Sequence, residues 1–535
     1  MLGVVGVLCK LIGVLYRVPL AAIVGAQGLG QFQLVFPFYT LLLTISSAGL
    51  PVALSVQVAR MAATGQGAHS RVLLRGALLR LGALGALGTL AMALGSGALA
   101  AATGDAQAWR GFLALSPAIV LVMLLAACRG YLQGWADMAS TAVSQLLEQL
   151  ARVAISLPMA ALGMRRGPAV AAAMALLGTT LAEVAALAYV GWVCARHAQR
   201  HAPAPERVPT SAGGAHRAWL RAAWPVTCVA ALVPLMNLLD TFTCVGGLLR
   251  GGLTAQQTAA YGWHQGADAL AETAVTLYGL YSGAVLTLLN VCGAVALALA
   301  TAVAPWVART HAQGDAEGLR RHATFILRAT WLLGLPCTAG LFLLADPLMA
   351  LFYPGFAPSQ LAEAARMLRV SAAGVACFML AQGTAGVLQG MGLHRRPMQG
   401  MALGMACKLA LGALLLPHPT VGVLGAAWGS VLGFAVCAVW NTVALLRATR
   451  ARMPWGSALR TLMAAGGMAG ALYAALAVFG APAHSAHTLA WVCMAAALYA
   501  ALACILGAVV SDDLRILPGG VALAQRLLRR HVLRA

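Results

Sequence analysis

Residues 3–24 read GVVGVLCKLIGVLYRVPLAAIV, an apolar stretch that contains two cations, Lys10 and Arg17. A stretch of about 20 apolar residues is long enough for a helix to cross the hydrocarbon core of a membrane. The two cations are two helical turns apart, so they lie on one face of the predicted helix. A charge inside a bilayer costs about 2.5 kcal/mol or more and normally faces a bundle interior or a watery cavity. Lys10 and Arg17 are therefore candidate functional residues.

The rest of the chain has the same character, with 61% hydrophobic and only 9% charged residues among 535. Its apolar runs are about 20 residues long and are separated by Arg, Gly and Pro clusters, which indicates helices rather than a barrel of short alternating strands. The sequence predicts an all-α polytopic membrane protein with fourteen transmembrane helices, at 3–24, 32–58, 77–102, 110–132, 140–163, 168–194, 222–247, 275–307, 324–345, 367–389, 398–416, 420–446, 460–480 and 487–510.

The net charge of +21 follows the predicted topology. Every loop after an even-numbered span is basic, whereas the odd-numbered loops hold few bases. The positive-inside rule then places both termini in the cytoplasm. This distribution explains the charge without a nucleic-acid partner. No basic residue precedes the first apolar stretch, so we expect it to be a retained helix rather than a cleaved signal peptide.

Two sequence echoes indicate an internal duplication. Residues 58–65 resemble residues 307–314 at an offset of 249, and 130–134 resemble 386–390 at an offset of 256. The second offset also carries Arg152 onto Lys408. Because six spans per copy give both copies the same orientation, the two lobes should be related by an axis along the membrane normal. The predicted domains are an N-lobe at 1–195, a cytoplasmic linker at 196–221, a C-lobe at 222–447, spans 13 and 14 at 448–511, and a basic amphipathic cytoplasmic tail at 512–535.

Ionisable residues inside the predicted spans carry the strongest chemical signal. Only two of the 35 basic residues are lysines, and both lie within apolar spans, which suggests that these positions require a compact ammonium group. Two alternatives stay open. Glu148 and Arg152 could neutralise each other at i, i+4, and either lysine could pair with an acid as structural glue. The candidate site residues are Lys10, Arg17, Glu148, Arg152, Glu183, Asp240 and Lys408.

Signals for catalysis, metals and cofactors are poor. The chain contains no H-E-x-x-H, G-x-S-x-G or P-loop motif, and its histidine pairs lie in loops at spacings that chance supplies. The twelve cysteines are scattered, with no C-x-x-C pair, and are typical of small core residues. We therefore expect a protein that is not an enzyme, with no catalytic residue, no metal site and no cofactor.

Several motifs together resemble one family of membrane proteins, that of polysaccharide biosynthesis and stage V sporulation protein B. This family is related to the MurJ lipid II flippases within the multidrug/oligosaccharidyl-lipid/polysaccharide (MOP) exporter superfamily. The resemblance covers spans 1–12, and the chain departs from the family pattern at Val291, where the pattern has proline. The motifs include Lys10-x-x-Gly13, Tyr16-Arg17-Val18-Pro19, Gly28-x-Gly30, residues 48–55, Arg129-Gly130-Tyr131-x-Gln133-Gly134, Ser144-Gln145-x-x-Glu148-Gln149-x-x-Arg152, Asn237-x-x-Asp240 and Lys408.

The resemblance implies a MATE-like, two-lobed transporter that flips a polyprenyl-pyrophosphate-linked saccharide, with lipid II favoured, by alternating access. Moving a pyrophosphate through an apolar core requires cations at several depths. In this hypothesis Lys10 and Arg17 hold the diphosphate and Arg152 and Lys408 receive it. The acids Glu148, Asp240 and Glu183 pair with the bases or couple an ion. The resemblance also implies the cytoplasmic (inner) membrane of a bacterium as the location. The expected partners are the lipid-linked oligosaccharide and membrane lipids.

Two other functions are weighed against this one. A multidrug efflux antiporter of the same superfamily should place unpaired acids and aromatic residues in its cavity, whereas the first span is purely cationic. A non-transporting scaffold of an envelope-synthesis complex should show no lipid translocation.

Overall fold

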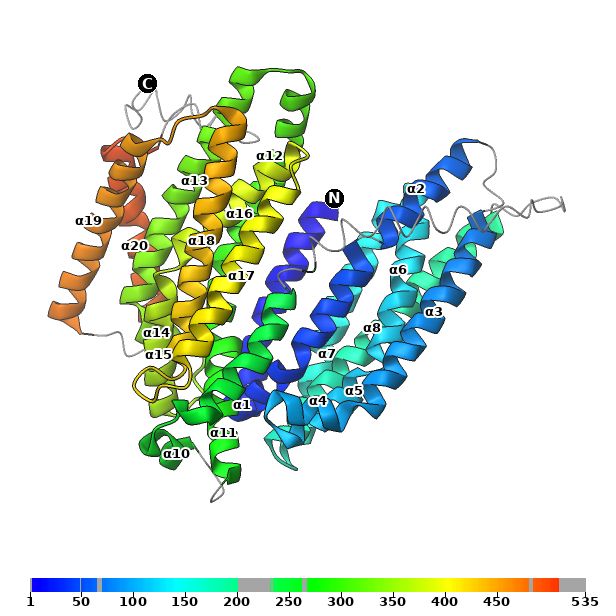
Figure 1. Ribbon diagram of the computed structural model, residues 1–535, viewed down its shortest axis with the longest axis horizontal. Coiled ribbons are helices and arrows are strands. Elements are labelled where there is room, and N and C mark those ends of the chain that lie inside the picture. Colours follow the sequence, from blue (N-terminus) through cyan, green and yellow to red (C-terminus); the bar gives the residue numbers. More distant parts are fainter. Residues whose placement is uncertain are drawn as a thin grey trace. The chain divides into compact units, whose positions relative to one another are not determined.

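The computed structural model describes residues 2–48, 50–64, 70–200, 231, 234–261, 267–480 and 485–509, apart from some side chains within the helices. Every regular element in these residues is a helix, so the predicted all-α class is confirmed (Figure 1). The chain divides into two compact units, unit 1 (Met1–Gly283) and unit 2 (Ala284–Ala535).

Unit 1 is a bundle in which α6 packs against α2, α3 and α8, and α7 packs against α1 and α8. Residues 234–247 are also helical. Its elements are α1 (Leu2–Ala48), α2 (Leu50–Ala63), α3 (Ser70–Leu94), α4 (Ser96–Thr103), η2 (Ala106–Ala108), α5 (Trp109–Leu115), α6 (Ala118–Gly134), α7 (Met138–Met164), α8 (Pro168–Arg200), η3 (Leu248–Gly252), α10 (Ala255–Tyr261), α11 (Ala267–Tyr278) and the start of η4 (Gly279–Val285).

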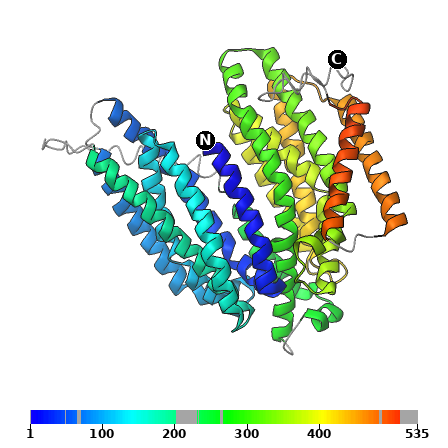
Figure 2. The ribbon, with the colours of Figure 1, turned by 180° about the vertical axis from the view of Figure 1, so that it is seen from behind.

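Unit 2 is a second bundle, in which α16 packs against α12, α13 and α18. The last two helices, α19 and α20, lie side by side and contact α13 (Figure 2). Its elements are α12 (Leu286–Ala312), α13 (Ala316–Leu343), α14 (Ala345–Phe352), α15 (Pro358–Ala372), α16 (Val375–Gly390), α17 (Arg395–Leu415), α18 (Leu424–Thr449), α19 (Trp455–Phe479) and α20 (Ser485–Ile505).

Eleven of the described helices are long and apolar enough to cross a membrane, or twelve if α15 and α16, bent by 49°, form one span. The predicted number of fourteen is not confirmed. One reason is that α1, which consists of two helices joined across a kink at Gly25, covers the first predicted span and part of the second and is counted once. Another is that residues 222–230 of the predicted seventh span lie outside the described residues. The prediction of a multi-pass membrane protein holds with either number.

A glycine bends α1 into two arms. Gly25 adopts φ 68° and ψ −177°, a conformation that a residue with a side chain rarely takes. Just beyond the bend, α1 meets the backbone of the last helices of unit 1. A Cβ atom at Gly30 would lie 2.1 Å from the carbonyl oxygen of Val275, and one at Gly279 would lie 2.4 Å from that of Ala26. The division between the units therefore falls after α11, whose backbone is held against α1.

The internal duplication is visible in the packing. In unit 1, a Cβ atom at Gly134 would lie 2.5 Å from Cβ of Val58. In unit 2, a Cβ atom at Gly390 would lie 3.2 Å from Cβ of Val307. These are the residue pairs that the two sequence echoes relate, so both units make the same kind of contact at the related positions. In both units a small residue on one helix lets another helix approach closely, as is common in membrane bundles.

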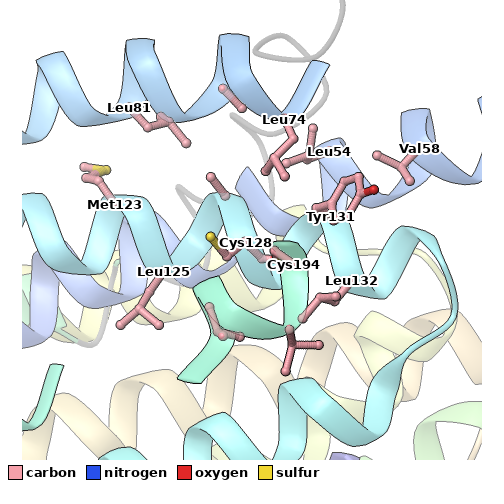
Figure 3. Packing of buried hydrophobic residues seen from close by; sticks show 14 of the residues in the cluster. Leu54, Val58, Leu74, Leu81, Met123, Leu125, Cys128, Tyr131, Leu132 and Cys194 are labelled. Carbon is pink, nitrogen blue, oxygen red and sulfur yellow. The ribbon is translucent and has the colours of Figure 1, made fainter. Parts of the chain in front are cut away.

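The equivalent segments also build equivalent cores. The unit 1 cluster contains Leu54, Val58 and Tyr131 (Figure 3), and its counterpart in unit 2 contains Val303, Val307 and Val387. Each member of the first group maps onto one of the second by the offsets of 249 or 256. The two cores therefore share a plan but differ in detail, since Tyr131 is replaced by a valine.

Most of the predicted linker, and the predicted tail, lie outside the described residues. Helix α8 continues to Arg200, into the segment predicted as linker, and nothing between residues 201 and 230 is described. The description ends at residue 509, before the predicted amphipathic tail. The predicted domain limits at 195, 221, 447 and 511 therefore stay predictions.

We expect Gly30→Ala to destabilise the protein, because the added methyl group meets backbone atoms of α11 that cannot rotate away. Overpacking of this kind costs about 1–3 kcal/mol. The measurement is the thermal unfolding of the purified protein in detergent. The matched control is Gly191→Ala in α8, where nothing lies within 4 Å of the new Cβ and the higher helix propensity of alanine should be neutral or stabilising. Equal stability of the two variants would contradict the close α1–α11 contact.

Candidate functional site

Helix α7 supplies a stripe of buried polar residues. Ser144, Glu148 and Arg152 are spaced by four residues, so they lie on one face of the helix, and all three are buried. Asp137 caps the start of α7 by accepting a hydrogen bond from the backbone N–H of Ser140 at 3.0 Å. Because charges are costly against lipid, this face turns into the bundle and meets α1, α6 and α8.

Arg129 of α6 holds one end of the stripe. Its Nε donates to Oγ of Ser144 at 3.0 Å, and its Nη2 lies 2.9 Å from Oε2 of Glu148. Arg129 belongs to one of the family motifs but is not among the predicted intramembrane charges. It lies within the predicted span 110–132, and this position was the signal that could have identified it. Arg129 is 6% exposed, so its charge is stabilised mainly by the hydroxyl of Ser144 and the carboxylate of Glu148 rather than by water.

Arg152 joins three helices at the centre of the site. Its Nη2 donates to the hydroxyl of Tyr39 at 2.7 Å and lies 3.3 Å from Oε1 of Glu148 and 3.5 Å from Oε1 of Glu183. Tyr39 in turn donates to Glu183 Oε1. Glu183 comes from α8, and Tyr39 from the second arm of α1. The structure therefore brings together three of the predicted residues, Glu148, Arg152 and Glu183.

This arrangement, which we call the charge cluster, contains Arg129, Glu148, Arg152 and Glu183 with the hydroxyl of Tyr39. Two guanidinium groups face two carboxylates, so the formal charges balance. Glu148 is the shared partner, with one oxygen on each arginine. The cluster is not fully satisfied among the described residues, because Oε2 of the completely buried Glu183 and Nε of Arg152 have no hydrogen-bond partner.

Arg17 connects to the charge cluster through aromatic rings. Its guanidinium carbon lies 5.8 Å from the centre of the Phe36 ring, and the Phe36 and Tyr39 ring centres are 5.5 Å apart. At the other end, the guanidinium carbon of Arg152 lies 5.4 Å from the Tyr39 ring centre. Cations favour the faces of such rings. Arg17 is half-buried, whereas Arg152 is buried.

The remaining predicted residues lie apart from the charge cluster. Asp240 is buried in the helix of residues 234–247, and Lys408 is buried in α17 of unit 2. The side chain of Lys10 lies outside the described residues, although its backbone belongs to α1.

By the offset of 256, the unit 2 positions equivalent to Arg129, Ser144 and Glu148 are Ala385, Gly400 and Gly404. Unit 2 thus retains the cation of the stripe and lacks its acid. No group of three His, Cys, Asp or Glu residues in the described part of the chain could hold a metal ion.

Helices that are long and apolar enough to cross a membrane, packed around buried ion pairs, define a polytopic membrane protein. A family model described as polysaccharide biosynthesis protein matches residues 1–311, and a second, described as lipid II flippase MurJ, matches residues 250–501. The chain belongs to the polysaccharide biosynthesis protein family, which confirms the resemblance found in the sequence.

Comparison with individual proteins agrees with this assignment. The chain is 24% identical to stage V sporulation protein B of Bacillus subtilis (strain 168), over 96% of this chain and 95% of the relative. Its fold is similar to lipid II flippase MurJ in an inward closed conformation, with a TM-score of 0.66 at 13% identity, over 94% of this chain and 98% of that one. It is also similar to an inward-facing MATE transporter of the MOP superfamily, with a TM-score of 0.64 at 14% identity, over 82% and 94% of the chains.

Replacing Glu148 by Gln should strongly destabilise the protein, because two buried arginines lose their shared counter-ion. Breaking a buried ion pair by removing one partner costs about 3–5 kcal/mol. The measurement is thermal unfolding in detergent. The double variant Glu148→Gln with Arg129→Gln should recover part of the loss, since it removes one uncompensated cation.

The matched control is Glu317→Gln, which removes the exposed i, i+4 pair with Arg321 and should change stability little. If Glu148→Gln unfolds at the same temperature as this control, the charge cluster does not hold the helices of unit 1 together.

Proposed function

We propose that the protein is a flippase that translocates a polyprenyl-pyrophosphate-linked saccharide across the bacterial cytoplasmic membrane by alternating access, with the peptidoglycan precursor lipid II as the favoured substrate. Membership of the polysaccharide biosynthesis family supports a saccharide substrate. The match of residues 250–501 to the lipid II flippase model supports a lipid carrier. In this proposal both termini are cytoplasmic, as the distribution of basic loops indicates.

The observation that carries the proposal is the shared carboxylate of Glu148. Its two oxygens bind Arg129 and Arg152 at the same time, so each of the two buried cations has a counter-ion in an apolar bundle. A diphosphate offers the same acceptor chemistry with more oxygens and more charge. It could therefore replace Glu148 on the arginines, while Glu148 takes up a proton or another cation. Exchange of one anion for another avoids an uncompensated buried charge at every stage.

Arg17 and Lys10 would make the first contact with the diphosphate. The described part of α1 shows Arg17 half-buried over Phe36, and Lys10 lies two helical turns away. The aromatic connection from Phe36 to Tyr39 leads towards Arg152. Lys408 would be the receiving cation of unit 2, and Asp240 and Glu183 would serve as further charge partners or as sites for a coupling ion. The lipid tails of the substrate would stay in the bilayer.

We expect Lys10→Ala and Arg17→Ala to reduce flipping at least about tenfold, because each removes a charge-assisted contact worth about 1.5–3 kcal/mol. The measurement uses liposomes that contain the purified protein and lipid II, with the headgroup exposed on each leaflet counted over time. Arg17→Lys should retain part of the rate because it preserves the charge.

The matched control is Arg80→Ala, which removes an exposed arginine of α3 and should leave the rate unchanged. Wild-type rates in both Lys10→Ala and Arg17→Ala would exclude the proposed roles of these cations. If the wild-type protein moves no lipid-linked saccharide, the flippase proposal fails. Export of cationic dyes would then favour the antiporter, and inactivity with both substrates would favour the scaffold.

A further inference from the structure

A second buried acid lies in unit 1, away from the charge cluster. Asp105 precedes the short helix η2, in the connection between α4 and α5, and its side chain is buried. Its Oδ1 accepts a hydrogen bond from the backbone N–H of Gln107 at 2.8 Å. Its Oδ2 accepts one from Nε2 of Gln31 at 3.0 Å. Gln31 belongs to the second arm of α1, so this bond ties the α4–α5 connection to α1.

Only one of the two polar atoms of the Gln31 side chain, Nε2, is hydrogen-bonded to Asp105. Gln31 is only 5% exposed, and its Oε1 accepts no hydrogen bond from the described residues. A carboxylate cannot supply one, because in its ionised form it has acceptors only. A carboxylic acid can. Its O–H would donate to Oε1 while Nε2 continues to donate to the other carboxyl oxygen, and Gln107 could still donate to the acid. One added proton would therefore supply the donor that the buried Oε1 lacks.

The burial of Asp105 favours that proton. Burial raises the pKa of Asp105, the hydrogen bonds from Gln31 and Gln107 lower it by less, and the carboxylate of Glu272 on α11 adds a smaller upward effect. Helix α4 carries no charged side chain. The described charged groups of the other helices that pack on η2 have partners elsewhere: Arg17 over Phe36, Arg110 over Trp109, Glu183 with Tyr39, Arg196 over Trp192 and His197 with Asp137.

We propose that Asp105 and Gln31 form a proton-binding site that fastens η2 to the second arm of α1 when Asp105 is protonated. The proton completes a cyclic pair of hydrogen bonds between the acid and the amide. Because the folded protein then binds the proton more tightly than the opened segment does, the contact is complete at low pH and weakens as the pH rises through the pKa of Asp105. The site does not depend on which substrate the protein carries.

The experiment is hydrogen–deuterium exchange of the full-length protein in detergent between about pH 4 and about pH 8, corrected for the intrinsic effect of pH on exchange. We expect the amides of residues 106–109 to be roughly tenfold better protected at the acidic end, because an unsatisfied buried acceptor is costly. Asp105→Asn cannot gain or lose a proton in this range, so its protection should be independent of pH. Gln31→Leu removes the amide partner of the acid, so it should lower the protection at the acidic end.

The matched control is Asp137→Asn, which changes another helix-capping acid and should leave the exchange of residues 106–109 as in wild type. Glu272→Gln should shift the transition of wild type to lower pH without removing it. The proposal is overturned if Asp105→Asn keeps the wild-type pH dependence, or if wild type shows none. The readout is independent of lipid translocation, so the flippase proposal and this one can fail separately.

Discussion

The shared carboxylate of Glu148 allows two arginines to be buried in a bundle that is otherwise apolar. An arginine without a counter-ion would be too costly at this depth, so it would have to reach towards water and separate the helices. With one oxygen on Arg129 and the other on Arg152, Glu148 binds α6 and α7 to each other and, through Tyr39 and Glu183, to α1 and α8. The packing of these four helices depends on that compensation.

The two copies of the duplicated unit differ in the buried polar residues that they carry. Both units keep the close contacts at Gly134 and Gly390, which the bundle needs for packing. The acid that binds the arginines in unit 1 corresponds to Gly404 in unit 2, where the space is taken by the backbone of Gly433. A position that one copy uses for charge is thus used by the other for close contact between α17 and α18.

The sequence was sufficient to predict the fold class and part of the site, because these depend on composition and on spacing along one helix. Glu148 and Arg152 are four residues apart, and a helix must place them on one face. The partners from other helices could not be predicted. Nothing in the spacing joins Tyr39 to Arg152 or Arg129 to Glu148, since these contacts depend on how the helices pack. The gap between the first two predicted spans lies near Gly25, and the backbone leaves the helical conformation there, although the count of fourteen spans is not confirmed.

The balance of the charge cluster has a consequence for how the protein responds to voltage. Moving one elementary charge across the membrane potential involves about 2.3 kcal/mol per 100 mV. With all four groups ionised, the two arginines and two glutamates carry no net charge, so a displacement of the intact cluster along the membrane normal requires no net electrical work. Any dependence of the transport cycle on membrane potential must then arise from charges outside the cluster, from the transported anion, or from a proton or ion that breaks the balance.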